Sequence, residues 1–280
     1  MTQSRQQSPQ AQAAEQLLSD VSAAASIDDL ETVAKSLLAD LARGLARVAL
    51  VRQNPSLGTQ VARLRWMFAD GRTPFVLVPS TAVELVTLAR FAQRVAHDFK
   101  LPTVIALDAE VAESMNSLEL SLLLHAATEP RLQRADAVPL RMGPDAALLQ
   151  WQGLVCGNAE VLAKHRTDRQ PAGEAKLDWL VISYGGTSIP AQAAVDQARC
   201  KNLGVDHLVL QTLSPLPERT IVAAAMGKRF VVVVERNVGQ LHSEIQRLCP
   251  SLPVVLVSSA IEPVTPELVL GALLRFPRCC

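Results

Sequence analysis

The carboxylate of Glu235 is the side chain in this sequence best placed to do chemistry. It directly follows the apolar run at 230–234, and Asn237, Gly239 and Gln240 come next, where a helical pattern starts. A carboxylate at the end of a buried strand can be a general base with a raised pKa, or it can bond the amides of a turn or of a neighbouring chain. Because the same turn holds no histidine, cysteine or second carboxylate, the pattern favours a structural role over catalysis.

Two other turns also follow apolar runs. The sequence Tyr184-Gly185-Gly186-Thr187 resembles a phosphate-binding loop, but it lacks both G-x-G-x-x-G and the Walker lysine, so it is a weak indicator of a nucleotide site. The turn at 213–217 holds two prolines and therefore presents few backbone donors.

Histidine and cysteine add no recognisable catalytic or metal-binding motif. The histidines fall on separate predicted elements, and the sequence contains no G-x-S-x-G and no H-E-x-x-H. The five cysteines include no C-x-x-C and lie near no histidine pair at metal spacing. We therefore expect neither a metal site nor an Fe–S cluster in this chain.

The apolar runs that must position these turns indicate a parallel α/β module. Parallel strands that are covered on both faces have sequences of nearly continuous Val, Ile and Leu. Right-handed crossover connections between such strands form an open, mostly parallel sheet. Proline is favoured in the first turn of a helix, and three of the four expected helices begin near one. The expected strands are 180–184, 208–210, 231–234 and 254–257, with helices from Pro190, Pro217, Gly239 and Pro266.

A second, smaller α/β unit is expected upstream. Strands at 48–51, 75–79 and 102–107 surround one helix, which Ser80 or Thr81 caps. From 126 to 173 the periodicity weakens and prolines and glycines accumulate, which is typical of a linker, with room for one helix in 158–169. We expect an N-terminal helical segment at 1–47, an α/β domain at 48–125, a linker at 126–175 and a final domain at 176–280.

Composition excludes several classes of function. With 27 basic and 27 acidic residues the net charge is zero, and only 4% of residues are aromatic, so we expect no nucleic-acid or anionic membrane partner. No apolar stretch approaches the roughly 20 residues of a spanning helix. The polar, Gln-rich start does not resemble a secretory signal, which predicts a cytoplasmic location.

Several segments of the sequence resemble those of a known family. They are Arg52-Gln53-Asn54-Pro55-Ser56-Leu57-Gly58, Tyr184-Gly185-Gly186-Thr187, Leu213-Ser214-Pro215-Leu216-Pro217-Glu218 and Val234-Glu235-Arg236-Asn237-Val238-Gly239-Gln240-Leu241. In this order they resemble the α-chain of 2-oxoacid:ferredoxin oxidoreductases of the 2-oxoglutarate type. The loop of that family reads Arg-x-Gly-Pro-Ser-Thr-Gly, from which this chain departs at Asn54 and Leu57.

The resemblance implies a fold and a reaction. The fold is a partial thiamine-pyrimidine-type α/β domain followed by an open parallel-sheet domain of the transketolase C-terminal type. The reaction is oxidative decarboxylation of a 2-oxoacid to an acyl-CoA with thiamine diphosphate, with ferredoxin as electron acceptor. The family's pyrimidine-binding glutamate should precede the Arg52 loop, but the 51 residues before it do not resemble that region. The chain is thus similar to an N-terminally shortened α-chain that is not catalytic alone.

The resemblance also assigns partners and sites. Thiamine diphosphate with Mg²⁺ would be bound only in an assembled complex with a β-type subunit, and Fe–S clusters would lie in a ferredoxin-like subunit. Arg52, Ser56 and Gly58 are expected to face the cofactor cleft. We expect Glu235, Asn237 and Gln240 to contact another subunit, because they lie at the carboxyl edge of the last sheet. The alternative is a non-catalytic interaction or assembly protein derived from that subunit.

Overall fold

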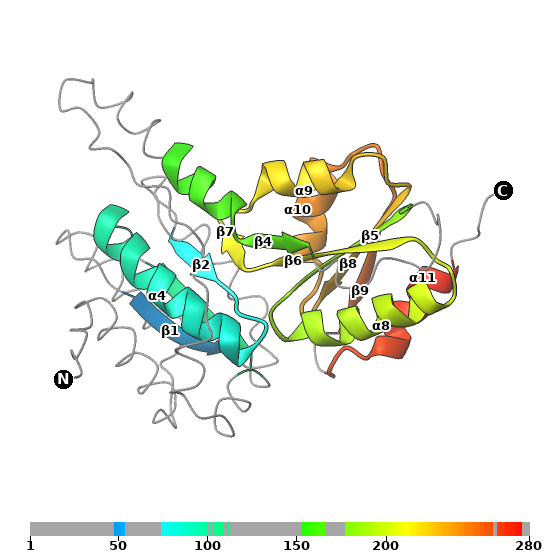
Figure 1. Ribbon diagram of the computed structural model, residues 1–280, viewed down its shortest axis with the longest axis horizontal. Coiled ribbons are helices and arrows are strands. Elements are labelled where there is room, and N and C mark those ends of the chain that lie inside the picture. The colour runs from blue at the N-terminus through cyan, green and yellow to red at the C-terminus, as the bar shows by residue number, and fades with distance from the viewer. Residues whose placement is uncertain are drawn as a thin grey trace, which may run out of the picture.

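The structure is a computed structural model that describes residues 48–53, 74–99, 101, 103–108, 111, 153–165, 177–259 and 262–275. These residues form two β-sheets with helices packed on their faces (Figure 1). The elements are β1 (Val48–Gln53), β2 (Phe75–Leu77), α4 (Ala82–Phe99), β3 (Thr103–Asp108), β4 (Ala163–His165), β5 (Trp179–Tyr184), α8 (Ser188–Cys200), β6 (Val205–Leu210), β7 (Thr212–Ser214), α9 (Glu218–Ala225), β8 (Phe230–Glu235), α10 (Gln240–Leu248), β9 (Val254–Ser258) and α11 (Pro266–Arg275).

The larger sheet confirms the parallel α/β module. Its strand order is β4-β6-β5-β8-β9, and β5, β6, β8 and β9 are parallel. The central strands β5, β6 and β8 are almost entirely buried, which explains the apolar runs at 180–182, 208–210 and 231–234 within them. The short strand β4 pairs antiparallel with β6 at one edge.

Two layers of helices cover this sheet. Figure 1 shows α8 and α11 on one face and α9 and α10 on the other. The first face buries Val181, Val195 and Val269 in one apolar cluster, and the second buries Ile182, Ile221 and Ile245 in another. The helix expected from Pro190 starts two residues earlier, at Ser188, directly after a 3₁₀ turn at Gly185–Thr187. Proline is tolerated there because first-turn amides lack an intrahelical partner.

The smaller sheet has the order β1-β3-β2-β7, in which β1, β3 and β2 are parallel. Helix α4 covers one face with a fully buried apolar stripe. Its start confirms the expected cap: Thr81 Oγ1 accepts a hydrogen bond from the Glu84 amide at 3.2 Å, and Glu84 Oε2 accepts one from the Ser80 amide at 2.8 Å.

The two sheets share a stretch of chain. After β6 the chain enters β7, which pairs antiparallel with β2 of the smaller sheet. Between them, the Gln211 amide donates to Leu162 O at 2.8 Å, and Gln211 O accepts from the Val78 amide at 2.9 Å. The sheets are therefore connected by backbone hydrogen bonds as well as by side chains.

Part of the expected linker is regular structure. Residues 153–160 are helical, and Ala163–His165 forms the edge strand of the larger sheet. Loss of periodicity was a poor guide here because the helix and strand are both short. The other boundaries stay predictions, and residues 1–47 lie outside the described ranges. Within those ranges no helix has the length and apolar character that crossing a membrane requires.

Candidate functional site at the carboxyl edges of the two sheets

The carboxyl ends of β3 and β5 meet at one place. Asp108, the last residue of β3, accepts a hydrogen bond through Oδ2 from the backbone amide of Gly186, in the turn after β5. Gly185 has φ +54°, and a Cβ at this position would collide with the Asp108 carboxylate. Only glycine fits both the backbone conformation and the close approach.

Thr187 ties this turn to the next strand. Its Oγ1 lies 2.7 Å from Tyr184 O and 3.1 Å from Val234 O, and its hydroxyl donates to these carbonyls. Because these carbonyls belong to β5 and β8, the hydroxyl joins adjacent strands at their carboxyl ends. The turn is therefore held from both sides.

Tyr184 and Asn237 form a buried pair beside the turn. Asn237 Nδ2 donates to the Tyr184 hydroxyl oxygen at 2.9 Å, and Asn237 Oδ1 accepts from the amides of Gly239 at 2.8 Å and Gln240 at 3.2 Å. Burial, and then the charges of Glu235 and Asp108, raise the pKa of Tyr184 far above its ordinary value. The phenol therefore keeps its proton and serves as a fixed polar group.

Glu235 has a structural role within the chain. Its side chain is fully buried, and its two oxygens accept from the amides of Leu241 at 2.9 Å and His242 at 3.1 Å, in the first turn of α10. Burial raises the pKa of the Glu235 carboxyl, although these amides act in the opposite direction. This geometry is the turn-bonding alternative that the sequence left open.

A cavity of about 430 Å³ opens next to the turn. Asp108 and Arg236 give it two charged groups, and its walls are mostly apolar. None of its described lining residues is a histidine, cysteine or lysine, so this lining suits binding better than proton transfer or nucleophilic attack. The lining residues are Asp108, Gly186, Thr187, Ile189, Pro190, Ala193, Arg236, Pro263, Val264 and Pro266.

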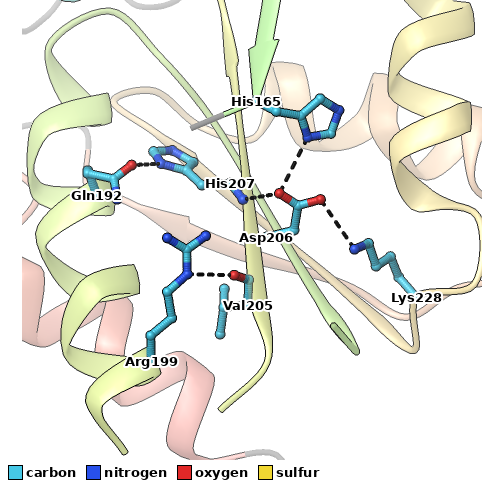
Figure 2. A network of polar contacts seen from close by, with 7 residues as sticks. All are labelled: His165, Gln192, Arg199, Val205, Asp206, His207 and Lys228. Carbon is cyan, nitrogen blue, oxygen red and sulfur yellow. Dashed lines mark hydrogen bonds and ion pairs between the residues drawn. The ribbon is translucent and has the colours of Figure 1, made fainter. Parts of the chain in front are cut away.

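A chain of buried hydroxyls also connects the two sheets. Ser80 Oγ, before α4, donates to Ser188 Oγ at 3.2 Å, and Ser188 lies 3.0 Å from Ser183 Oγ in β5. Ser183 Oγ is 2.8 Å from His207 Nε2. His207 Nδ1 is in turn 2.8 Å from Gln192 Oε1, as Figure 2 shows. A serine beside an imidazole is typical of a nucleophile and its base. Ser183 and His207 are fully buried, so here the pair positions α8 rather than meeting a substrate.

Gln211, which directly follows the carboxyl end of β6, has an unusual buried side chain. Its side chain is fully buried, yet among the described residues no group hydrogen-bonds its Oε1 or Nε2. Burying a primary amide without partners is costly, and such groups are rare in folded proteins. No sequence pattern indicated this feature, because Gln211 follows an ordinary apolar strand.

The residues expected to bind cofactor are only partly described. Arg52 lies in β1 opposite Leu107 in β3, so β1 ends at the edge of the smaller sheet that carries Asp108. Ser56 and Gly58 lie outside the described residues. The role of all three stays a prediction.

The residues expected at a subunit interface are close together but differ in exposure. Asn237 is buried and Gln240, the first residue of α10, is half-buried. The carboxylate of Glu235 is turned into the chain, so direct contact with a partner through this side chain is disfavoured. The interface itself stays a prediction. Asp108 was missed as a site residue, although its place at the end of a strand was a usable signal.

The described residues do not fit the metal-bound half of thiamine diphosphate. Mg²⁺ in such sites takes carboxylate and other oxygen ligands. Among the described residues, no three His, Cys, Asp or Glu side chains gather into a possible metal site. At the carboxyl edge, the carboxylates of Asp108 and Glu235 already accept hydrogen bonds from backbone amides. The described residues at this edge therefore offer no ligand set for the Mg²⁺ of this cofactor.

Comparisons with known proteins agree with this architecture. Residues 177–265 match the family model described as pyruvate:ferredoxin oxidoreductase core domain II. The chain is 35% identical over 85 residues to the 2-oxoglutarate synthase subunit KorA of Methanothermobacter marburgensis. This alignment covers 30% of this chain and 23% of the relative. Its counterpart in Methanothermobacter thermautotrophicus is 35% identical over 100 residues, covering 35% and 27%. The alignments thus span about a quarter of these curated relatives.

A solved structure extends the similarity of fold to both sheets. The alignment with the 2-oxoglutarate:ferredoxin oxidoreductase from Magnetococcus marinus covers 95% of this chain and 60% of the chain in that structure. The TM-score is 0.59 and the sequence identity is 13%. At that identity the match concerns the fold alone. Taken with the sequence matches, the larger sheet and its helices are similar to core domain II of the 2-oxoacid:ferredoxin oxidoreductases.

Proposed function

We propose that this chain is an α-type subunit of a thiamine-diphosphate-dependent 2-oxoacid:ferredoxin oxidoreductase complex, and that it is not catalytic alone. The observation that carries the proposal is the match of residues 177–265 to core domain II. The complex would release the 2-oxoacid carboxylate as CO₂, join the acyl group to the sulfur of coenzyme A, and pass the electron pair to an Fe–S acceptor.

The contribution of this chain would be to bind and position. The carboxyl edges of the two sheets are fixed to one another through Asp108 and Gly186, and the cavity beside them has two charged groups in an apolar surround. β1, which contains Arg52, ends at that edge. This arrangement supports a role for Arg52, Ser56 and Gly58 beside a cofactor that a partner subunit holds.

Partner chains would supply the remaining chemistry. A β-type subunit would bind thiamine diphosphate and Mg²⁺, and a ferredoxin-like subunit would carry the Fe–S clusters. The relatives named KorA are themselves described as subunits. We expect the complex in the cytoplasm.

The second candidate is a non-catalytic assembly protein derived from such a subunit. It is favoured by the state of the polar groups at the carboxyl edge. The oxygens of Glu235 and the amide of Asn237 are bonded within the chain, and Ser183 and His207 are buried. These groups stabilise a scaffold without offering a reactive centre.

Co-expression with the candidate β-type and ferredoxin-like chains tests the proposal. We expect the tagged full chain to co-purify with both, and the complex to reduce a viologen dye only when a 2-oxoacid, coenzyme A and thiamine diphosphate are all present. Omission of this chain is the control and should abolish the reduction. A stable complex without turnover would support the assembly protein, and failure to co-purify with either chain would contradict both candidates.

A further inference from the structure

A second cavity, of about 600 Å³, runs along α9 beside the edge strand β4. It lies away from the contact between Asp108 and Gly186, and none of its lining residues is shared with the carboxyl-edge cavity. It is lined by Glu160, His165, Asp206, Arg219, Thr220, Ala223, Ala224, Met226 and Lys228.

The carboxylate of Glu160, at one end of the cavity, already accepts hydrogen bonds from other residues of this chain. Its Oε2 accepts from the Thr220 amide at 2.8 Å and the Thr220 hydroxyl at 2.7 Å, and its Oε1 accepts from the Arg219 amide at 3.1 Å. The carboxylate therefore caps the first turn of α9, and few of its lone pairs remain for a ligand.

The carboxylate of Asp206, at the other end, also has hydrogen-bond partners within the chain. Its Oδ1 accepts from the His207 amide at 2.9 Å and lies 3.3 Å from His165 Nδ1, and its Oδ2 accepts from Lys228 Nζ at 3.3 Å (Figure 2). Burial tends to raise the pKa of Asp206, but Lys228 and His165 outweigh it and hold the pKa below its usual range. The carboxylate is thus ionised near neutral pH and already shared among the His207 amide, His165 and Lys228.

The cationic groups have donors to spare. Lys228 is half-buried, although only 9% of its side chain is exposed, and its ammonium has three N–H donors. Among the described residues it makes one hydrogen bond, to the carboxylate that His165 also contacts. At the other end Arg219 is 79% exposed and only its Nε approaches Glu160, at 3.9 Å. Both cations line the cavity, so its unused hydrogen-bonding capacity consists mainly of positively charged donors.

The shape of the cavity limits the ligand. Arg219 is in the first turn of α9 and Lys228 lies beyond its last turn, so the two are separated by about the length of the helix, roughly 12 Å. Between them the wall is apolar, with Ala223, Ala224 and Met226, which is 75% exposed. A ligand that fills the cavity must be elongated and must present an apolar body to this wall.

We propose that this cavity binds a small, elongated metabolite whose oxyanion, a phosphate or a carboxylate, is held by Lys228 and whose apolar body lies along α9 toward Arg219. The assignment does not depend on the proposed function, because it uses different residues. Phosphate and carboxylate share the chemistry that Lys228 recognises, and a titration can distinguish them.

Calorimetric titration of the full chain with hexyl phosphate, and separately with hexanoate, tests the site. We expect saturable binding of at least one, with Kd on the order of 0.1 to 1 mM for a ligand of this size. Tighter binding of hexyl phosphate assigns a phosphate ligand, and tighter binding of hexanoate assigns a carboxylate. Lys228→Met should weaken the binding by about tenfold or more, because it removes a charged donor.

Two further variants keep the test decisive if Lys228→Met does not fold. Ala223→Trp fills the cavity from an exposed position and leaves Lys228 and Asp206 in the sequence, and it should weaken binding by a similar factor. Val222→Trp, on the same helix but outside the lining, is its matched control and should leave Kd within about twofold of the wild type. Absence of saturable binding to both ligands, or equal Kd values for the wild type and Ala223→Trp, would overturn the assignment.

Discussion

The carboxylate of Asp108 accepts a hydrogen bond from the backbone amide of Gly186, and this contact joins the carboxyl edges of two sheets that are far apart in the sequence. The chain of hydroxyls from Ser80 to Ser183 reinforces the same junction from inside. Because the cavity with Asp108 and Arg236 lies at this junction, its shape depends on how well the two sheets are held together.

The turn at Gly185 should not tolerate a side chain. Gly185→Ala places a Cβ against the Asp108 carboxylate at a φ of +54°, so we expect a loss of about 1 to 3 kcal/mol in the free energy of unfolding. Gly271→Ala is the matched control, because Gly271 lies inside α11 and has open space around it. It should stabilise the chain by up to about 1 kcal/mol. Urea denaturation measures both, and equal midpoints for the two variants would contradict the structure.

Replacing Glu235 by glutamine should destabilise the fold. The amide NH₂ of Glu235→Gln would face one of the two backbone amides that the carboxylate now satisfies, at a cost of about 1 to 3 kcal/mol. Glu262→Gln, at an exposed position, should change the free energy of unfolding by less than about 0.5 kcal/mol. A Glu235→Gln variant as stable as the wild type would remove Glu235 as the cap of α10.

The cost of Glu235→Gln should also depend on pH. Burial raises the pKa of Glu235 in the folded chain above its ordinary value of 4.5. The unfolded chain therefore loses this proton first as pH rises, so the wild type loses stability from about pH 4.5 up to the raised pKa, while the variant has no titrating group at this position and shows no such change. The stability gap between wild type and variant should narrow over that window. A gap that widens with pH would show that the folded pKa is lowered instead.

Gln211 and Gln192 should respond oppositely to the same substitution. Gln211→Met removes a buried amide that has no hydrogen-bond partner among the described residues, so the isolated chain should gain up to about 2 kcal/mol. Gln192→Met removes the acceptor of His207 Nδ1 and should cost about 1 to 2 kcal/mol. Thermal unfolding monitored by circular dichroism measures both. A destabilising Gln211→Met would mean that the amide is satisfied in solution.

The sequence predicted those features that depend on local pattern. The runs at 180–184 and 231–234 indicated buried parallel strands, and Ser80 or Thr81 indicated the start of α4, because strand burial and helix capping are set by neighbouring residues. The three-residue strands β4 and β7 were missed, since so few residues show no periodicity.

Long-range contacts at the site lay beyond such reasoning. Nothing local pairs Asp108 with Gly186, and nothing local shows whether the Glu235 carboxylate points to a partner or back to Leu241. The resemblance predicted a family for the larger sheet, and the expected interface at Glu235 was inferred from its place at the carboxyl edge of that sheet. In the structure the Glu235 carboxylate accepts hydrogen bonds from two backbone amides, which sequence patterns do not mark.

If the segment from Glu235 to Gln240 is a subunit interface, its exposed members should carry the contact. Val238 is 67% exposed, whereas Glu235 and Asn237 are buried, so Val238→Asp changes the surface and leaves the caps of α10 in place. Burying an unpaired carboxylate in an interface is costly, and we expect affinity for the partner subunit to fall about tenfold or more. Leu268→Asp, 48% exposed on α11, is the control. Surface plasmon resonance against the co-purified partner measures both, and equal affinities for the two variants would move the interface elsewhere.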